Sequence, residues 1–382
     1  MKFAHLGDCH LGGWRQPELK ELNFRSFQYA IEKCLFEKVD FILISGDLFD
    51  SAYPPIDTLK GVFSEFRKLN DAKIPVFLIA GSHDYSASGK SFLDVLEKSG
   101  FCRNVVLFEE RNDKIVLQPT IFKNVAIYGY PGKKSSLEVE ELGKIAIQDA
   151  PGLFKILLLH TAIRDAVGNL PIHAVNHEQL PKVDYLALSH LHINYIKENK
   201  VYSGPIFPNN VQELEELKGG SFYIIDNGRI KREEIKLKEI LVLDIEIKNA
   251  FDATEQILDA LKKENLREKI LILKLCGTLE KGKSTDIDFA KIENYVKNEK
   301  VFVFLKSTTK LHLSEPELNL EILDSANLES AIIQKFEESN PSKFNPLIFP
   351  LTRAFQLEKL EEEKTSVFEE RLLSEIRKII SL

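Results

Sequence analysis

Aspartate and histidine side chains repeatedly stand at the end of short apolar segments in this sequence. The clearest case is the segment 39–50, VDFILISGDLFD, in which an apolar run leads into Gly46, Asp47 and Asp50. A run of this length predicts one buried strand rather than a helix. Because open α/β sheets keep their sites at the carboxyl ends of strands, we expect Asp47 to lie at such an edge. Four more apolar runs end in the same way. The first leads to Asp8 and His10, the second to Ser82, His83 and Asp84, the third to His160, and the fourth to His190 and His192.

Residues of these types could form a two-metal centre for phosphodiester hydrolysis. That reaction needs a nucleophile at neutral pH and relief of the phosphate charge, and two metal ions roughly 3.5–4 Å apart supply both. One carboxylate should be shared by the ions, and Asp47 is the natural bridge. Mixed Asp and His ligation suits manganese or iron better than magnesium. A single histidine after a strand is ordinarily a packing residue, but five of the nine histidines follow strands here, which favours a metal site.

The spacing within two of the motifs predicts how their side chains point. Asp8 and His10 are two positions apart, so both should face one side of an extended segment. His190 and His192 repeat this spacing. Cys9 should then point the other way, as a packed thiol.

Length and composition restrict the classes of protein. At 382 residues the chain exceeds the usual size of one hydrophobic core, so we expect two or three domains. Its net charge of −7 means that nucleic acid would bind only through a local patch or through metal ions. The four scattered cysteines predict reduced thiols. With neither a signal peptide nor an apolar run long enough to span a membrane, we expect a cytoplasmic protein.

Periodicity divides the chain into three regions. Residues 1–237 alternate between strand and helix patterns, which predicts a layered α/β domain with helices over 24–38, from Pro54 to about 72, and over 137–147. Residues 238–315 read as a small α/β module without a ligand cluster. Residues 316–382 are charged and predict helices over 328–338 and 353–380, separated by a proline-containing loop at 340–350.

The motifs together resemble the signature of calcineurin-like metallophosphoesterases, because D-x-H, G-D, G-x-H-D, a single histidine and H-x-H occur in the family order. More narrowly, FAHLGDCHLG, SGDLFD with the following proline, and the added module and tail resemble the archaeal Mre11/SbcD nucleases of DNA double-strand-break repair. The resemblance implies a layered α/β metallophosphoesterase sandwich over 1–237. It also implies a small capping domain on the DNA side over 238–315, and a linker and helical partner-binding tail over 316–382.

The resemblance also implies roles for single residues. Two manganese ions per subunit would be held, the first by Asp8, His10, Asp47 and His192 and the second by Asp47, Ser82, His160 and His190. His83 would contact the scissile phosphate and assist the leaving oxygen, while Asp84 either orients His83 or caps its loop. The family usually has Asn at position 82, so the second metal should bind more loosely. Some members have His at position 50, so Asp50 puts exonuclease strength in question. The histidines that match no ligand motif are expected to be structural: His5, His173, His177 and His312.

The implied activity is exonuclease and endonuclease cleavage of DNA, at double-strand ends and in single strands. Subunits would pair through the helix stripe Leu59, Val62, Phe63 and Phe66, although this stripe could instead pack on its own sheet. The tail would dock on the coiled coil of an SMC-like ATPase of the Rad50 type through Leu360, Phe368, Leu372 and Ile376. Folding of the tail onto its own second domain is the alternative.

Two other functions stay open from the sequence. The core motifs alone also fit a small-molecule phosphodiesterase. A weakly catalytic or non-catalytic scaffold that binds DNA ends is the other alternative, because Ser82 could reduce metal affinity. The added module and the charged tail favour the nuclease, since a small-molecule enzyme has no evident use for them.

Overall fold

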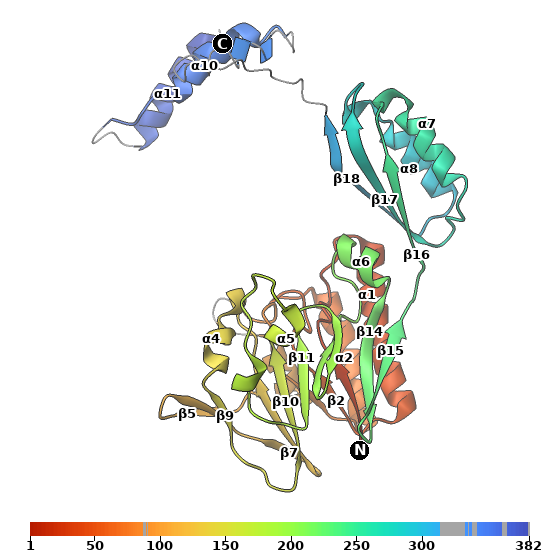
Figure 1. Cartoon of the computed structure of the whole chain (residues 1–382), viewed down its shortest axis with the longest axis vertical. Helices are drawn as coiled ribbons and strands as arrows, with labels where there is room; N and C mark the ends of the chain where they lie inside the picture. The colour runs from red at the N-terminus through yellow and green to blue at the C-terminus, as the bar shows by residue number, and fades with distance from the viewer. Residues whose placement is uncertain are drawn as a thin grey trace. The chain divides into compact units, whose positions relative to one another are not determined.

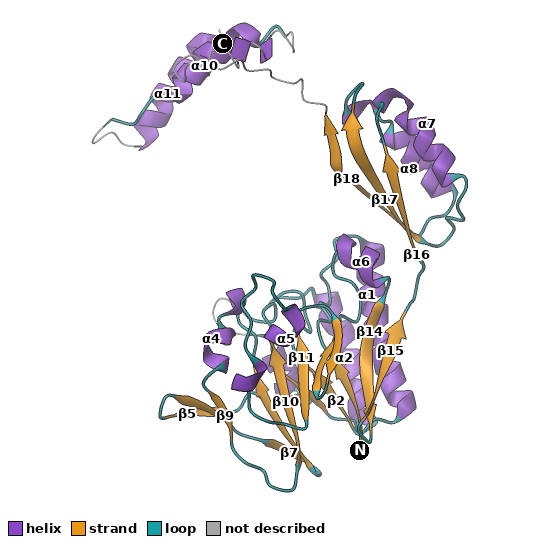
Figure 2. Cartoon of the chain, in the orientation of Figure 1, coloured by secondary structure: helices purple, strands orange, loops and turns teal. Residues whose placement is uncertain are grey.

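A computed structural model describes residues 1–86, 89, 91–313, 333–334, 336–337, 342–360 and 365–380. The chain divides into two compact units (Figures 1 and 2). The first comprises residues 1–277 and 281–311, and the second comprises residues 278–280 and 312–382. All the strand ends that deliver expected site residues belong to the first unit.

A six-stranded sheet carries the first three motifs. Its strand order is β15-β14-β1-β2-β3-β4. The parallel strands are β1 (Lys2–Leu6), β2 (Phe41–Ile44), β3 (Val76–Leu78) and β4 (Arg103–Asn104), and the antiparallel strands are β14 (Gly220–Asp226) and β15 (Arg229–Ile235). The crossovers are α1 (Pro17–Glu37), α2 (Ile56–Asp71) and α3 (Phe92–Lys98). Since β1, β2 and β3 are parallel, the loops after them leave the same edge of the sheet.

A second six-stranded sheet carries the remaining histidines, with the order β12-β13-β11-β10-β8-β7. Its strands are β7 (Thr120–Phe122), β8 (Val125–Tyr130), β10 (Phe154–His160), β11 (Tyr185–Ser189), β12 (Asn194–Lys197) and β13 (Lys200–Ser203). Shorter elements surround it: β5 (Phe108–Arg111), β6 (Lys114–Leu117), α4 (Glu138–Leu142), β9 (Ile145–Ile147), α5 (Arg164–Val167) and α6 (Val211–Leu217). His160 is the last residue of β10, and His190 follows β11 directly.

The two sheets pack face to face; α1 and α2 cover the outer face of the first sheet, while β6, β9, α4 and loops cover that of the second (Figure 1). Alternation along β1 shows why: Phe3 lies in the core between the sheets, and Ala4 lies in the core against the helices. Across the inner layer Phe3 and Phe41 stack with ring centroids 5.0 Å apart. The expected layered α/β architecture is therefore confirmed.

Two expected helices in this domain were placed wrongly. The first begins at Pro17 rather than at residue 24, because Pro suits the first helical turn and Leu19 and Leu22 are buried. The segment 137–147 is not one helix: α4 ends at Leu142, and β9 then pairs in parallel with β6. Long-range strand pairing decides the second case, which local periodicity does not report.

The small module contains both strands and helices, as expected of an α/β module. They are β16 (Ile240–Glu246), α7 (Ala250–Leu261), β17 (Ile270–Leu279), α8 (Phe289–Asn298) and β18 (Val303–Leu313), with strand order β16-β17-β18. Ile270, Ile272 and Leu305 share a buried cluster with Trp14 and with Leu214 of α6. Lys274 of β17 adds an ion pair to Glu215 of α6 at 2.7 Å. The domain boundaries at 237/238 and 315/316 stay predictions.

The tail differs from its prediction. Its described helices are α10 (Asn345–Phe355) and α11 (Thr365–Ile380), which contact each other, and residues 356–360 between them are not helical. The expected single helix over 353–380 is therefore wrong, as is the expected loop over 340–350. Pro346 fits the first turn of α10 and Pro350 lies inside it. The helix expected over 328–338 falls mostly outside the described residues. None of the described helices is long and apolar enough to cross a membrane.

Candidate metal centre

The expected ligands lie on loops with an unusual backbone conformation. φ is positive at Asp8 (48°), His10 (44°), Asp47 (50°), His190 (100°) and His192 (54°). Such conformations cost residues other than glycine on the order of 1–3 kcal/mol each, and they cluster at functional sites. The expectation of an extended segment is therefore wrong, although Cys9 between the first pair is buried in the core as expected.

Two glycines let these loops approach one another closely. Gly46 has a φ of +109°, and a Cβ built on it would lie 2.5 Å from Nδ1 of His160. A Cβ on Gly81 would overlap the carboxylate of Asp47. The glycines of SGD and GSHD thus bring the ends of β2, β3 and β10 together.

Asp8, His10 and His192 form the first group, with one donor atom from each residue within 4.8 Å of the others. Nε2 of His10 and Nε2 of His192 are 3.0 Å apart. Carboxylates on the far side of the rings bind the other nitrogens: Oδ1 of Asp50 lies 3.2 Å from Nδ1 of His10, and Oε1 of Glu213 lies 2.9 Å from Nδ1 of His192. If each Nδ1 donates to its carboxylate, the two Nε2 lone pairs face each other, which calls for a cation between them.

Asp8, Asp47 and His160 form the second group. Oδ2 of Asp47 lies 3.2 Å from Nε2 of His160 and 3.6 Å from Nε2 of His10, so one carboxylate oxygen stands between histidines of both groups. Nε2 of His160 is buried and has no hydrogen-bond partner in the described part of the chain, while its Nδ1 contacts Oγ of Ser189 at 2.8 Å. A buried imidazole nitrogen that faces buried carboxylates without an aligned hydrogen bond fits divalent metal ions.

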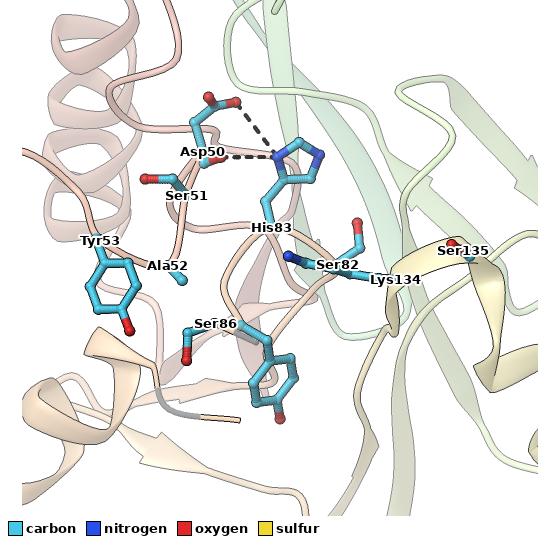
Figure 3. Close-up of a pocket in the computed structure, with 10 residues that line it drawn as sticks. Asp50, Ser51, Ala52, Tyr53, Ser82, His83, Ser86, Lys134 and Ser135 are labelled. Carbon is cyan, nitrogen blue, oxygen red and sulfur yellow. Dashed lines mark hydrogen bonds and ion pairs between the residues drawn. The ribbon is translucent and has the colours of Figure 1, made fainter. Parts of the chain in front are cut away.

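His190 and Ser82 lie close to these groups but outside them. The ring of His190 is centred 5.0 Å from that of His160, and its backbone N–H donates to both carboxylate oxygens of Asp8, at 2.9 and 3.0 Å. Ser82 lines a cavity next to His83 (Figure 3). The structure thus brings together Asp8, His10, Asp47, His160 and His192, with His190 and Ser82 beside them, and the ligand roles of all seven residues stay predictions.

Charges in the centre shift the pKa values of its histidines. Burial opposes protonation of His160, but the carboxylates of Asp47 and Asp8 outweigh it and raise the pKa of His160 to about 9. Burial is likewise outweighed at His192, where Asp8 and Glu213 raise the pKa to about 9. At His190, burial and then the nearby His160 lower the pKa to about 4. Burial disfavours the charge of Asp47, but His160 and His10 hold its pKa well below its usual value.

These shifts predict that metal binding releases protons at neutral pH. His160 and His192 are protonated at pH 7 in the metal-free protein, and a metal needs them neutral. Metal affinity should therefore rise between pH 7 and about 9 and level off above. The stability of the metal-free fold depends on pH in the opposite direction. Because folding raises the pKa of both histidines, their protonation stabilises the fold fully below about pH 6.5, and this contribution is lost as the pH rises toward 9. Calorimetry in buffers of different ionisation enthalpy counts the protons; equal release at pH 7 and pH 10 would contradict the assignment.

His83 and Asp84 hold the GSHD loop in place. Nδ1 of His83 donates to the carbonyl oxygen of Asp50 at 2.9 Å, which leaves Nε2 as its other nitrogen (Figure 3). The buried carboxylate of Asp84 accepts hydrogen bonds from the N–H groups of Gly81 (2.9 Å), Phe49 (3.0 Å) and Leu48 (3.3 Å). Of the two roles considered for Asp84, these bonds match loop capping, and the Asp50 carbonyl is the group that orients His83.

Residues outside the motifs support the ligands, and sequence reasoning missed them. Glu213 binds His192 and also accepts from the backbone N–H of Asn209 at 2.8 Å. Ser189 holds His160. Glu213 follows no apolar run with a ligand pattern, and Ser189 ends the strand before His190 but is not of a residue type that such a pattern singles out, so only the folded arrangement shows them. His5 is structural as expected, bound to Tyr185 and Ser45 at 3.0 Å each, and burial lowers its pKa to about 3.

The proposed dimer stripe is partly used inside the chain. Val62 and Phe66 are fully buried in the core between α1, α2 and the first sheet. Leu59 and Phe63 pack at its edge and are only partly buried. Val62 and Phe66 therefore follow the alternative that the sequence left open, in which the helix packs on the sheet of its own subunit. The homodimer stays a prediction that rests on Leu59 and Phe63.

Substituting Ser82 tests its expected weakness as a ligand. Metal titration of the native chain should show two sites of unequal affinity, because a hydroxyl is a poorer donor than an amide carbonyl. Ser82→Asn should tighten the weaker site, whereas Ser51→Asn on another wall of the same cavity should change neither. Two equally tight sites in the native chain would contradict the argument.

Comparisons with known proteins agree with this geometry. The family model described as calcineurin-like phosphoesterase matches residues 1–194. The chain is 27% identical over 311 residues to the "DNA double-strand break repair protein Mre11" of Methanocaldococcus jannaschii, covering 78% of both chains. It is 27% identical over 305 residues to the protein of the same name from Archaeoglobus fulgidus, covering 72% of this chain and 68% of that one. It is also 28% identical over 262 residues to the "Uncharacterized metallophosphoesterase YhaO" of Bacillus subtilis, covering 63% and 61%. The chain therefore belongs to the calcineurin-like phosphoesterase family.

Proposed function

We propose that this chain is a manganese-dependent nuclease that cleaves DNA phosphodiester bonds in double-strand-break repair. The observation that carries the proposal is Oδ2 of Asp47 lying between Nε2 of His160 (3.2 Å) and Nε2 of His10 (3.6 Å), the position of a carboxylate shared by two ions. Relatives named as DNA double-strand break repair proteins, similar over most of their length, support DNA as the substrate.

In this proposal the two manganese ions, when bound, acidify a water molecule and offset the phosphate charge. The first ion would be held by Asp8, His10, Asp47 and His192, and the second by Asp47, Ser82, His160 and His190. His83, with about half of its side chain exposed, would bind the scissile phosphate and give a proton to the leaving oxygen. Asp50 and Glu213 keep Nδ1 of His10 and of His192 occupied, so that each Nε2 points inward.

A cleavage assay separates this function from its alternatives. Labelled single strands, labelled duplexes and a chromogenic phosphodiester are incubated with manganese, magnesium or a chelator. We expect both kinds of DNA to be cleaved with manganese and Asp47→Asn to be inactive, while Asp57→Asn, an almost fully exposed residue of α2, serves as the matched control. Hydrolysis of the chromogenic compound without DNA cleavage would favour a small-molecule phosphodiesterase. DNA binding without hydrolysis of either would favour a scaffold.

The tail would bind an SMC-like ATPase. Phe368, Leu372 and Ile376 recur every fourth residue along α11 and are half-buried, while Leu360 precedes the helix and is exposed. This spacing supports docking of a helix into an apolar groove. If a chain that lacks residues 365–380 still retained the ATPase on co-purification, this part of the proposal would fail.

Pairing of two subunits would let two centres act on one duplex. Leu59 and Phe63, at the edge of the helical core, would lie in that interface. Light scattering should give twice the chain mass and Phe63→Asp should halve it. A native monomer at micromolar concentration would end the idea.

A further inference from the structure

A cavity of about 550 Å³ opens beside His83. Its walls come from three loops: residues 50–53 after β2, 82–86 after β3 and 134–135 after β8 (Figure 3). The volume lies in the range of small-ligand sites and is large enough for one nucleotide. The proposed metal centre uses Asp50, Ser82 and His83 of this cavity and leaves Tyr53 and Lys134 without a role.

Lys134 supplies a positive charge to one wall. Its side chain extends toward Ser82 and His83 (Figure 3). Within the described residues no carboxylate lies at ion-pair distance from it, whereas the neighbouring Lys133 is paired with Glu141 at 2.6 Å. The turn that carries it includes Ser135 and Ser136 with φ of 59° and 54°, a costly conformation for residues other than glycine. In a chain of net charge −7, an ammonium group held at a cavity without an acidic partner fits a phosphate.

Tyr53 supplies an uncovered aromatic ring to the opposite wall. It is 69% exposed. A second cavity of about 390 Å³ also borders Tyr53, together with Phe92 and Val95. The ring therefore has open space on more than one side and is a platform on which a nucleobase could stack, an interaction worth about 1–3 kcal/mol per base.

We propose that this cavity binds one unpaired nucleotide next to the scissile phosphate, a deepening that rests on the proposed nuclease function. Tyr53 stacks against the base, and Lys134 binds a phosphate that flanks the scissile one. The carboxylate of Asp50 points toward His83 (Figure 3), 3.9 Å from Nδ1, and the ammonium group of Lys134 attracts the flanking phosphate. A base that lies on Tyr53 has left its duplex stack, and the strand must be single or frayed where it is cut.

Kinetics with matched variants test this subsite. For a single-stranded oligonucleotide, Tyr53→Ala should raise KM about 5- to 150-fold, the equivalent of 1–3 kcal/mol of stacking, and Tyr53→Phe should behave as wild type. An abasic nucleotide beside the cleaved bond should raise KM for the wild type but not further for Tyr53→Ala. Lys134→Gln should weaken binding of the strand and lower the slope of log affinity against log salt by about 0.7. The control variants are Tyr29→Ala and Lys60→Gln, exposed residues of α1 and α2.

The outcomes separate the subsite from the function on which it rests. Circular dichroism reports that the variants are folded, and bis(p-nitrophenyl) phosphate, which contains no nucleotide, reports the phosphodiesterase activity of the wild type. Wild-type KM for DNA in Tyr53→Ala and Lys134→Gln would overturn the subsite and leave the nuclease standing. Equal losses in Tyr53→Phe and Tyr53→Ala would overturn stacking. If the wild type hydrolyses the small compound and cleaves no DNA, both the function and the subsite fall.

Discussion

Asp84→Ala should lower the free energy of unfolding by about 3 kcal/mol or more. The Asp84 carboxylate accepts from three backbone N–H groups, those of Gly81, Phe49 and Leu48. Each buried donor left without an acceptor costs about 1–3 kcal/mol. Metal affinity should fall as well, because these bonds fasten the loop of Asp47 to the loop of Ser82 and His83.

Asp84→Asn should fall between the alanine variant and the wild type. An amide oxygen in the place of Oδ2 keeps the bonds from Gly81 and Leu48, while the NH2 group faces the N–H of Phe49. The charge itself contributes less, since burial and then Asp47 raise the pKa of Asp84 to about 7. Denaturant unfolding of the metal-free chain measures both variants, with Asp57→Ala as an exposed control. A wild-type midpoint for Asp84→Ala would show that these bonds do not hold the two loops together.

His83→Ala should reduce hydrolysis about 10²- to 10⁴-fold, the usual contribution of a positioned proton donor. Metal binding should persist, because His83 touches Asp47 only through its backbone N–H, which donates to Oδ1 at 2.8 Å and remains in the alanine variant. Stability should change little, since the side chain is about half exposed.

Metal titration and turnover of the chromogenic phosphodiester, measured on the same preparation of His83→Ala, separate the two effects. His177→Ala is a suitable control, because that histidine is also partly exposed and contacts Asp165 at 2.7 Å, outside the three groups of described residues that could hold a metal ion, one of which is His10, Asp50 and His83. Unchanged turnover in His83→Ala would remove His83 from the mechanism. Loss of metal would show that its side chain supports the ligands.

The sequence contains enough to predict most of the residues that gather at the candidate site and too little to predict the residues that support them. Asp47 and His160 are recognisable because each follows a short apolar strand, and that signal is local. Asp84 meets Leu48 and Phe49 across more than thirty residues, and Glu213 meets His192 from a separate helix. Those contacts depend on how the strand ends are aligned in space, which residue order does not report.

The backbone of the site and the outlying helices were harder to predict for two other reasons. The positive φ angles of Asp8 and His10 contradict the ordinary backbone preference of these residue types. They are held by hydrogen bonds between loops, such as the one from the N–H of His10 to the carbonyl oxygen of Asp47 at 2.9 Å. In the tail, Pro350 was interpreted as a helix breaker, yet it lies inside α10. Prolines mark helix ends only on average.

Three consecutive residues of α6 give the small α/β module a thermodynamic connection to the metal centre. Glu213 binds Nδ1 of His192 at 2.9 Å, Leu214 is buried with residues of β17 and β18, and Glu215 pairs with Lys274 at 2.7 Å. A shift of the module therefore acts on the orientation of His192 through one short helix. By reciprocity, any ligand that moves the module changes metal affinity by the same factor by which the metal changes affinity for that ligand. Metal affinity is thus a quantity through which movement of the module could be measured at a distance.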